Sequence, residues 1–140
     1  MLGTLRTQSA EVRSRFKKRV TAMCEDIAHA FGGTATVQFL RGVPNTYNDP
    51  ALTEELVGYA TELFGQDMVQ EMEKPFPGTD DLAVLSQACP TTYFVLGAPV
   101  EGTTDCGMHH PGVQFDEGVF WRGTALLANS ALEYLNARAS

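Results

Sequence analysis

The sequence predicts an α/β (α+β) fold, because helical and strand-like patterns alternate along the chain. In residues 12–31 apolar side chains recur at steps of three and four, the spacing of one face of an amphipathic helix. Residues 34–40 and 92–96 are rich in β-branched and aromatic side chains, which favour strands. Alternation of the two patterns is typical of layered α/β proteins.

The first 42 residues predict a β-α-β unit. Residues 2–7 predict a short strand, Ser9 is the expected N-cap of the following helix, and residues 34–40 predict the second strand. Gly32 and Gly33 are expected to end the helix in a left-handed cap. Its buried stripe is expected to consist of Val12, Phe16, Val20, Met23, Ile27 and Phe31. The connection between the strands should be right-handed, with the strands parallel or nearly so.

A loop rich in Gly, Pro and Asn at residues 42–48 predicts a domain boundary, which gives domains of residues 1–42 and 43–140. Asp49 and Pro50 are expected to begin the next helix, and Gly65 to end it. A strand at 68–72, a loop at 74–81, a short helix at 82–88 and a strand at 92–96 follow. Asp116 is the expected cap of the final helix, so the second region also alternates helix and strand.

Composition excludes several classes of protein. Apolar residues make up 44% of the 140 residues, which is typical of a globular domain. The net charge of -7 argues against nucleic-acid binding, and the basic run at 13–19 is interpreted as a solvated helix face. The three cysteines are far apart and predict neither a disulfide framework nor a zinc site. Without a long apolar run at the N-terminus, we expect no membrane span and a cytoplasmic location.

Three places carry side chains suited to a site. His109 and His110 follow Gly107 in a loop, and imidazole is the commonest transition-metal ligand, although adjacent loop histidines are more often solvated. Asp80 and Asp81 precede a helix, where capping is favoured over catalysis by about three to one. Arg6 is suited to clamping a substrate carboxylate through two parallel hydrogen bonds, but a lone strand arginine is more often a surface ion pair.

Six short motifs occur in one order along the chain. They are residues 3–7 (GTLRT), 48–49 (ND), 78–83 (GTDDLA), 94–97 (FVLG), 108–111 (MHHP) and 115–117 (FDE). This series resembles the C-terminal part of the M20 metallopeptidases, in particular the amidohydrolase branch of hippurate hydrolases and N-acyl-amino-acid amidohydrolases. The resemblance covers essentially the whole chain.

The resemblance implies two partial domains. Residues 1–42 are similar to half of a ferredoxin-like lid and dimerisation domain, and residues 43–140 to the C-terminal part of a catalytic domain that binds two divalent metals, zinc or manganese. His109 is similar to the last metal ligand of the family, Arg6 to the lid arginine that holds the substrate carboxylate, and Asp81 to an acid lining the site. Asp80 and Leu82 stand where the branch usually has Glu and Phe, so the pocket wall is expected to differ.

The other metal ligands and the catalytic glutamate of the family have no counterpart in these residues. A catalytic zinc takes about three protein ligands, so we expect a C-terminal fragment that does not hydrolyse N-acyl amino acids alone, with weak or absent metal binding and no residue assigned a catalytic role. Two alternatives stay open. One is a non-catalytic module that forms a homodimer through the strand edges of its lid, and the other is one chain of a split enzyme.

Overall fold

The computed structural model describes residues 1–40, 42–74, 78, 80–103 and 106–139. The chain divides into two units, called unit 1 and unit 2 below. Unit 1 contains Met1–Asp49 and Glu73–Thr91, and unit 2 contains Pro50–Met72 and Thr92–Ser140. Of the predicted loop at 74–81, residues 75–77 and 79 lie outside the described residues. The domain boundary at residues 42 and 43 stays a prediction.

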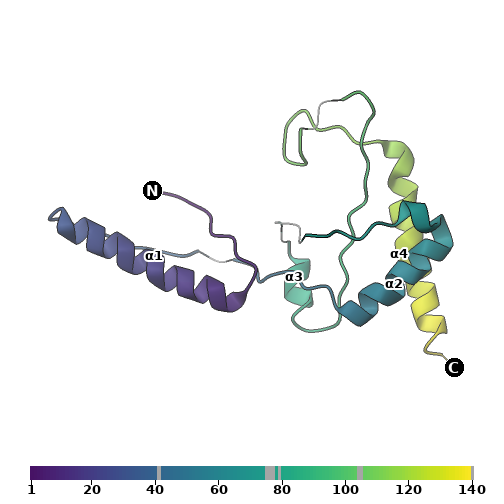
Figure 1. The fold of residues 1–140 in the computed structure, drawn as a ribbon, viewed down its shortest axis with the longest axis horizontal. Helices are drawn as coiled ribbons and strands as arrows, with labels where there is room; N and C mark the ends of the chain where they lie inside the picture. Colours follow the sequence, from purple (N-terminus) through teal and green to yellow (C-terminus); the bar gives the residue numbers. More distant parts are fainter. Residues whose placement is uncertain (41, 75–77, 79, 104–105, 140) are drawn as a thin grey trace. The chain divides into compact units, whose positions relative to one another are not determined.

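The predicted α/β fold class is wrong for the part of the chain that is described. Its regular elements are all helices, and Figure 1 contains no strand arrow, so the β-α-β ferredoxin-like half is not formed. Residues 2–7, 34–40 and 92–96 are irregular, and part of the strand expected at 68–72 falls in the 3-10 helix η1 (Gln66–Met68). The expected helix at 82–88 is α only over Leu82–Leu85 and continues in turns.

The error has a physical cause. β-Branched residues favour an extended backbone, but a strand also needs a ladder of hydrogen bonds to a neighbouring strand. The described residues form backbone bonds near these segments, such as Asp49 N to Thr91 O at 2.8 Å and Asp116 N to Ala98 O at 3.0 Å, but no ladder that is assigned as a strand pair. Local propensity alone therefore did not decide the structure, because the described residues contain no paired strands.

Unit 1 is built around the long helix α1 (Ala10–Ala30), whose ends agree with the sequence prediction. The Ser9 hydroxyl accepts a hydrogen bond from Val12 N at 3.0 Å, as an N-cap does. At the other end Gly32 has φ +73°, and the bonds Gly32 N to His29 O and Gly33 N to Ala28 O form a Schellman motif. A short helix α3 (Leu82–Leu85) follows later in the same unit and buries Ala83 completely.

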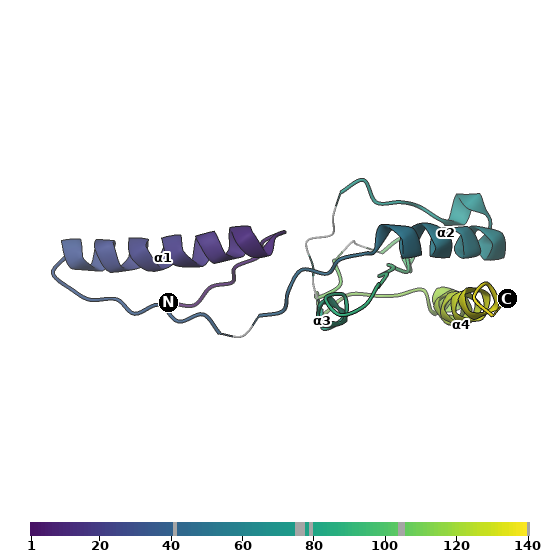
Figure 2. The same ribbon diagram turned by 90° about the horizontal axis from the view of Figure 1, so that it is seen from below.

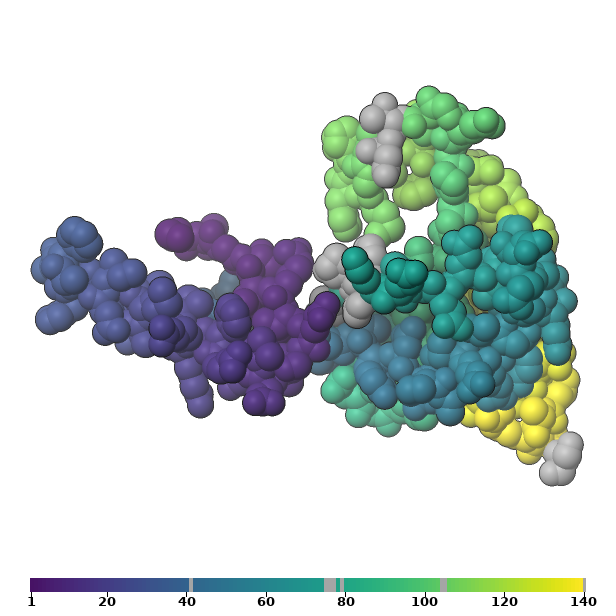
Figure 3. Space-filling view, viewed as in Figure 1, coloured from purple at the N-terminus to yellow at the C-terminus, as the bar shows by residue number. Residues whose placement is uncertain are grey.

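The apolar stripe of α1 is not buried, contrary to the sequence prediction. No residue of the helix is buried, and Phe16, Met23 and Ile27 are 46, 49 and 56% exposed. Figure 3 shows atoms of α1, in purple to blue, uncovered along the visible face of the helix. The ring of Phe39 lies against a different part of the helix, where Lys17 Nζ is 5.3 Å from its ring centroid. We call the six residues Val12, Phe16, Val20, Met23, Ile27 and Phe31 the α1 stripe.

Unit 2 is a pair of packed helices, α2 (Pro50–Phe64) and α4 (Phe120–Asn136), which lie side by side in Figure 2. Pro50 occupies the first helical position, and Gly65, with φ +90°, follows the last, as predicted. Asp116 Oδ1 accepts from Gly118 N and caps the 3-10 helix η2 (Glu117–Val119), which continues into α4.

The interior of unit 2 is small. Ala60 of α2 is 3% exposed and Ser130 of α4 is 7% exposed, while the rings of Phe64 and Trp121 meet edge to face at 6.0 Å. Small side chains such as alanine and serine allow two helices to approach closely. In the described part of the chain, no helix is both long and apolar enough to cross a membrane. The cytoplasmic location stays a prediction.

Candidate functional site

The structure places the three predicted site residues in both units. Arg6 and Asp81 belong to unit 1 and His109 to unit 2, and all three side chains are exposed. Their assignments as carboxylate-binding residue, site-lining acid and metal ligand stay predictions.

Arg6 lies in the extended segment that leads into α1. The carbonyl oxygen of the next residue, Thr7, accepts a hydrogen bond from Asn45 Nδ2 at 2.6 Å, so the backbone beside Arg6 is fixed to the loop at 43–47. A guanidinium on a fixed backbone is suited to a carboxylate, because its planar fork matches the two carboxylate oxygens.

The two aspartates before α3 differ in what they do. Asp80 Oδ1 accepts a hydrogen bond from Leu82 N at 2.8 Å, so Asp80 carries out the capping that the sequence favoured. Asp81 stands at the N-cap position with φ -65° and ψ -20°, and its side chain makes no capping bond. The carboxylate of Asp81 is thus not engaged by the start of the helix, whereas that of Asp80 is.

The loop at 107–113 gives its two histidines different surroundings. Gly107 has φ +68°, and a turn closes with His110 N donating to Gly107 O at 3.2 Å. His110 Nδ1 accepts from Gly112 N at 3.0 Å, which makes that nitrogen an acceptor and assigns the proton of the neutral ring to Nε2. His110 therefore helps to hold the loop, and both histidines are exposed.

The described residues do not assemble a metal centre. No group of three or more His, Cys, Asp or Glu side chains among them could hold a metal ion. His109 alone does not fit a catalytic divalent ion, which takes about three protein ligands. A zinc or manganese ion held by these residues alone is not supported by their geometry.

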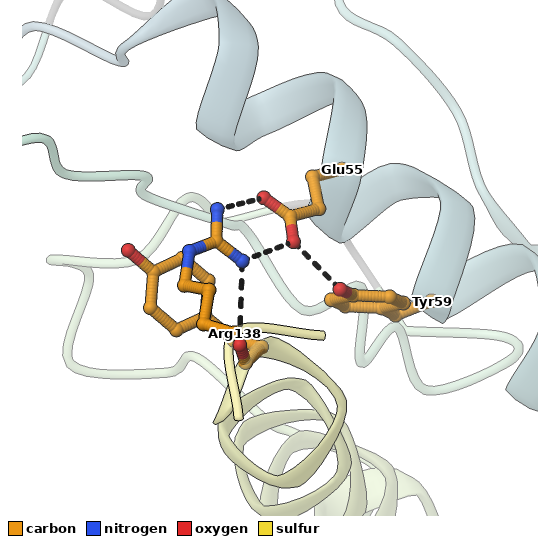
Figure 4. Close-up of polar contacts among 4 residues, drawn as sticks. Glu55, Tyr59 and Arg138 are labelled. Carbon is orange, nitrogen blue, oxygen red and sulfur yellow. Dashed lines mark hydrogen bonds and ion pairs between the residues drawn. The ribbon is translucent and has the colours of Figure 1, made fainter. Parts of the chain in front are cut away.

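The strongest polar cluster of unit 2 was missed by the sequence analysis. Arg138 Nη1 and Nη2 donate to Glu55 Oε1 and Oε2 at 2.7 and 2.9 Å, and Tyr59 OH donates to Glu55 Oε1 at 2.6 Å (Figure 4). The guanidinium carbon also lies 3.5 Å from the ring centroid of Tyr134. The spacing of Glu55 and Tyr59 by four residues was visible in the sequence, but nothing local indicates a partner 83 residues away.

These contacts explain the titration behaviour of the cluster. The hydrogen bonds from Arg138 and then Tyr59 lower the pKa of Glu55 to about 2. The same bonds raise the pKa of Tyr59 and that of Arg138. All three groups lie on α2 or just beyond α4, so the cluster ties the packed helices together and has the character of a structural clamp.

A hollow of about 360 Å³ lies on unit 1 near the first turn of α1. Neither Arg6 nor Asp81 lines it, so it does not coincide with the predicted site residues. Its lining has no charged side chain and consists of Gln8, Ser9, Ala10, Pro44, Asn45, Tyr47, Ser86 and Gln87.

Residues 5–133 match the model of peptidase family M20/M25/M40. The chain belongs to this family. The match covers most of both units, and it confirms the family that the ordered motifs indicated.

Three curated relatives show how far the likeness extends. The chain is 34% identical to thermostable carboxypeptidase 1 of Saccharolobus solfataricus over 69% of its own length and 24% of the relative. It is 30% identical to thermostable carboxypeptidase 2 of the same organism, over 97% of this chain and 34% of that one. It is 31% identical to the N-acetyl-L-cysteine deacetylase of Bacillus subtilis, over 96% and 31% respectively.

The chain thus spans between 24% and 34% of the length of these three relatives. No solved structure matches it significantly. Two of these relatives are named as carboxypeptidases and one as a deacetylase.

Proposed function

We propose that this chain supplies the substrate-binding and last-ligand portion of a metal-dependent hydrolase that cleaves the amide bond of N-acyl amino acids. The observation that carries the proposal is the family match over residues 5–133. The relative named N-acetyl-L-cysteine deacetylase supports an N-acyl amino acid as the substrate class.

Three residues have roles in this proposal. Arg6 binds the free carboxylate of the substrate through its two parallel N–H donors. Asp81, whose carboxylate makes no capping bond, lines the substrate site. His109 supplies one ligand to a divalent ion, and the engagement of His110 Nδ1 within the loop supports this choice.

The remaining ligands and the catalytic glutamate come, in this proposal, from polypeptide outside these 140 residues. The coverage of 24% to 34% of the three relatives supports that division. A divalent ion held by His109 together with ligands from that polypeptide would supply Lewis-acid chemistry for amide hydrolysis. The contribution of the described residues is limited to one ligand and to holding the substrate, which leaves the chain alone inactive.

A chimera tests the proposal directly. The matching segment of the Bacillus subtilis deacetylase is replaced by this chain, and release of the free amine from N-acetyl-L-cysteine is measured with zinc or manganese. His109→Ala should reduce turnover at least about 100-fold, because a metal ligand is lost, whereas His110→Ala should retain most of it.

Two results would count against the proposal. A folded, metal-loaded chimera without turnover would contradict the hydrolase function of this segment. An active chimera in which His109→Ala and His110→Ala behave alike would leave the function standing and remove the ligand role from His109. Activity of the chain mixed with a separately expressed remaining part would support the split-enzyme alternative.

A second candidate is a homodimerising interaction module, and the exposed α1 stripe favours it. The strand edges first expected to carry this contact are not formed by the described residues, so the proposed contact is the α1 stripe itself. Sedimentation equilibrium should then show a dimer at micromolar concentration that Met23→Glu converts to a monomer. A folded wild-type monomer at that concentration would contradict this candidate.

A further inference from the structure

Asn45 connects three segments of unit 1 by hydrogen bonds. Its Nδ2 donates to Thr7 O at 2.6 Å, and its Oδ1 accepts from Arg13 Nη2 at 3.4 Å. Arg13 Nη1 also donates to Val43 O at 2.7 Å. These part-buried bonds join residues that are 30 to 38 positions apart in the sequence, so they hold the chain together over long range.

The loop that carries Asn45 is bonded on its other side to the residues after α3. Gln87 Nε2 donates to Asn45 O at 3.4 Å, and Tyr47 N donates to Ser86 Oγ at 3.4 Å. Asp81 stands at the start of α3. The loop is therefore bonded both to the segment that bears Arg6 and to the residues that follow the helix started by Asp81.

The segment that bears Arg6 depends on this connection. It is extended and belongs to no sheet among the described residues, so no ladder of hydrogen bonds fixes its backbone. The bond from Asn45 to Thr7 O supplies a restraint one residue beyond Arg6. An amide suits this place, because it donates to Thr7 and accepts from Arg13 at the same time.

We propose that Asn45, held by Arg13, is a positioning residue that fixes the backbone around Arg6 for binding a carboxylate ligand. The inference rests on the proposed function, in which Arg6 binds the substrate carboxylate. Asn45 acts through the backbone. Because it already restrains the backbone beside Arg6, less conformational entropy is lost when Arg6 binds its ligand. None of the three hydrogen bonds requires a metal ion, so the role is measurable on this chain alone.

The experiment titrates the full chain with N-acetylglycine and follows the Arg6 Nε–Hε signal by NMR, assigned with Arg6→Ala. Wild type should show a saturable shift. Asn45→Ala should raise the Kd about 3- to 10-fold, which is the effect of losing one or two net hydrogen bonds. Asn45→Gln, which keeps the donor and the acceptor, should recover part of the affinity. Gln8→Ala, which removes an exposed amide nearby, should bind as wild type does.

The results separate the inference from the proposed function. An unchanged Kd in Asn45→Ala, an equal loss in Gln8→Ala, or a wild type without a saturable Arg6 shift would overturn the positioning role. An inactive chimera together with Asn45-dependent binding at Arg6 would remove the hydrolase function and keep the positioning role. Should Asn45→Ala lose the helical circular dichroism of wild type, Arg13→Lys is measured in its place, because lysine keeps the positive charge and removes the planar fork of arginine. The Kd of Arg13→Lys should rise by a similar factor. An unchanged Kd in Arg13→Lys would overturn the positioning role.

Discussion

The sequence predicts helices equally clearly in both units, but the helices of the two units differ in how far they are packed against other elements. In unit 2, α2 and α4 pack together, bury Ala60 and Ser130, and are clamped by the ion pair of Glu55 and Arg138. In unit 1, the longer helix α1 has both caps in place and buries none of its residues. The comparison separates two properties of a helix, because its ends are set by local residues and its burial requires a partner.

The largest expected difference between the units is in hydrogen exchange. Amides in the middle of α1 should exchange at least about 100-fold faster than those in the middle of α4, because a helix without buried contacts opens locally. Exchange measured by NMR or mass spectrometry at neutral pH checks this. Equal protection of α1 and α4 would mean that the α1 stripe is covered in solution, and would favour the dimer.

Enlarging Ala60, the buried residue of α2, should give the next largest effect, a loss of stability of unit 2. Ala60→Leu adds carbon atoms at a site that is 3% exposed, and overpacking of this kind costs about 1–3 kcal/mol. Trp121, the single tryptophan, lies in unit 2 and reports its unfolding by fluorescence in urea. Ala51→Leu, at an exposed position of α2, is the matched control and should leave the midpoint nearly unchanged.

Substitution of Ser130 should change the stability of unit 2 less than Ala60→Leu does, and it should increase that stability. Its Oγ is buried without a hydrogen-bond partner among the described residues, so Ser130→Ala removes a desolvated hydroxyl and should stabilise unit 2 by about 1 kcal/mol. Thr124→Ala, on the exposed side of α4, controls for helix propensity and should give a smaller gain. A loss of stability in Ser130→Ala would show that the hydroxyl has a partner in solution.

Loss of the ion pair between Glu55 and Arg138 should change the stability of unit 2 least, because Arg138 is about half exposed and solvent weakens the pair. The pKa of Glu55 is lowered from 4.5 to about 2, so its contribution is complete above pH 4.5 and is lost as the pH falls toward 2. The urea midpoint followed at Trp121 should fall more over this range in wild type than in Glu55→Gln. Glu54→Gln, an exposed neighbour, should keep the wild-type slope, and an identical slope in Glu55→Gln would contradict the clamp.

Sequence patterns predicted the helix boundaries well and the strands poorly, and the reason is the range of the interactions involved. Ser9 and Gly32 cap α1, and Pro50 takes the first position of α2, as predicted; Asp116 caps η2 rather than α4 itself. Each of these residues acts within a few positions of the chain, so a role at a helix end was readable. Strands at 34–40 and 92–96 needed partners that local residues do not specify.

The predictions for the candidate site show the same difference between local and long-range interactions. The preference of Asp80 for capping follows from its place before a helix and was predicted. The bonds of Asn45 to Thr7 and of Glu55 to Arg138 join residues 38 and 83 positions apart, and no spacing pattern in the sequence predicts such bonds. His109 was singled out by its loop and by the family motif, and its role as a ligand stays a prediction.

The central claim is that these 140 residues carry one ligand and the substrate-holding groups of a hydrolase without forming the complete site. The most direct measurement is hydrolysis of N-acetyl-L-cysteine by the purified chain alone, with zinc or manganese added. We predict no release of the free amine above that in buffer with metal. Robust turnover that His109→Ala abolishes would show that this chain holds a working site by itself, and would contradict the claim.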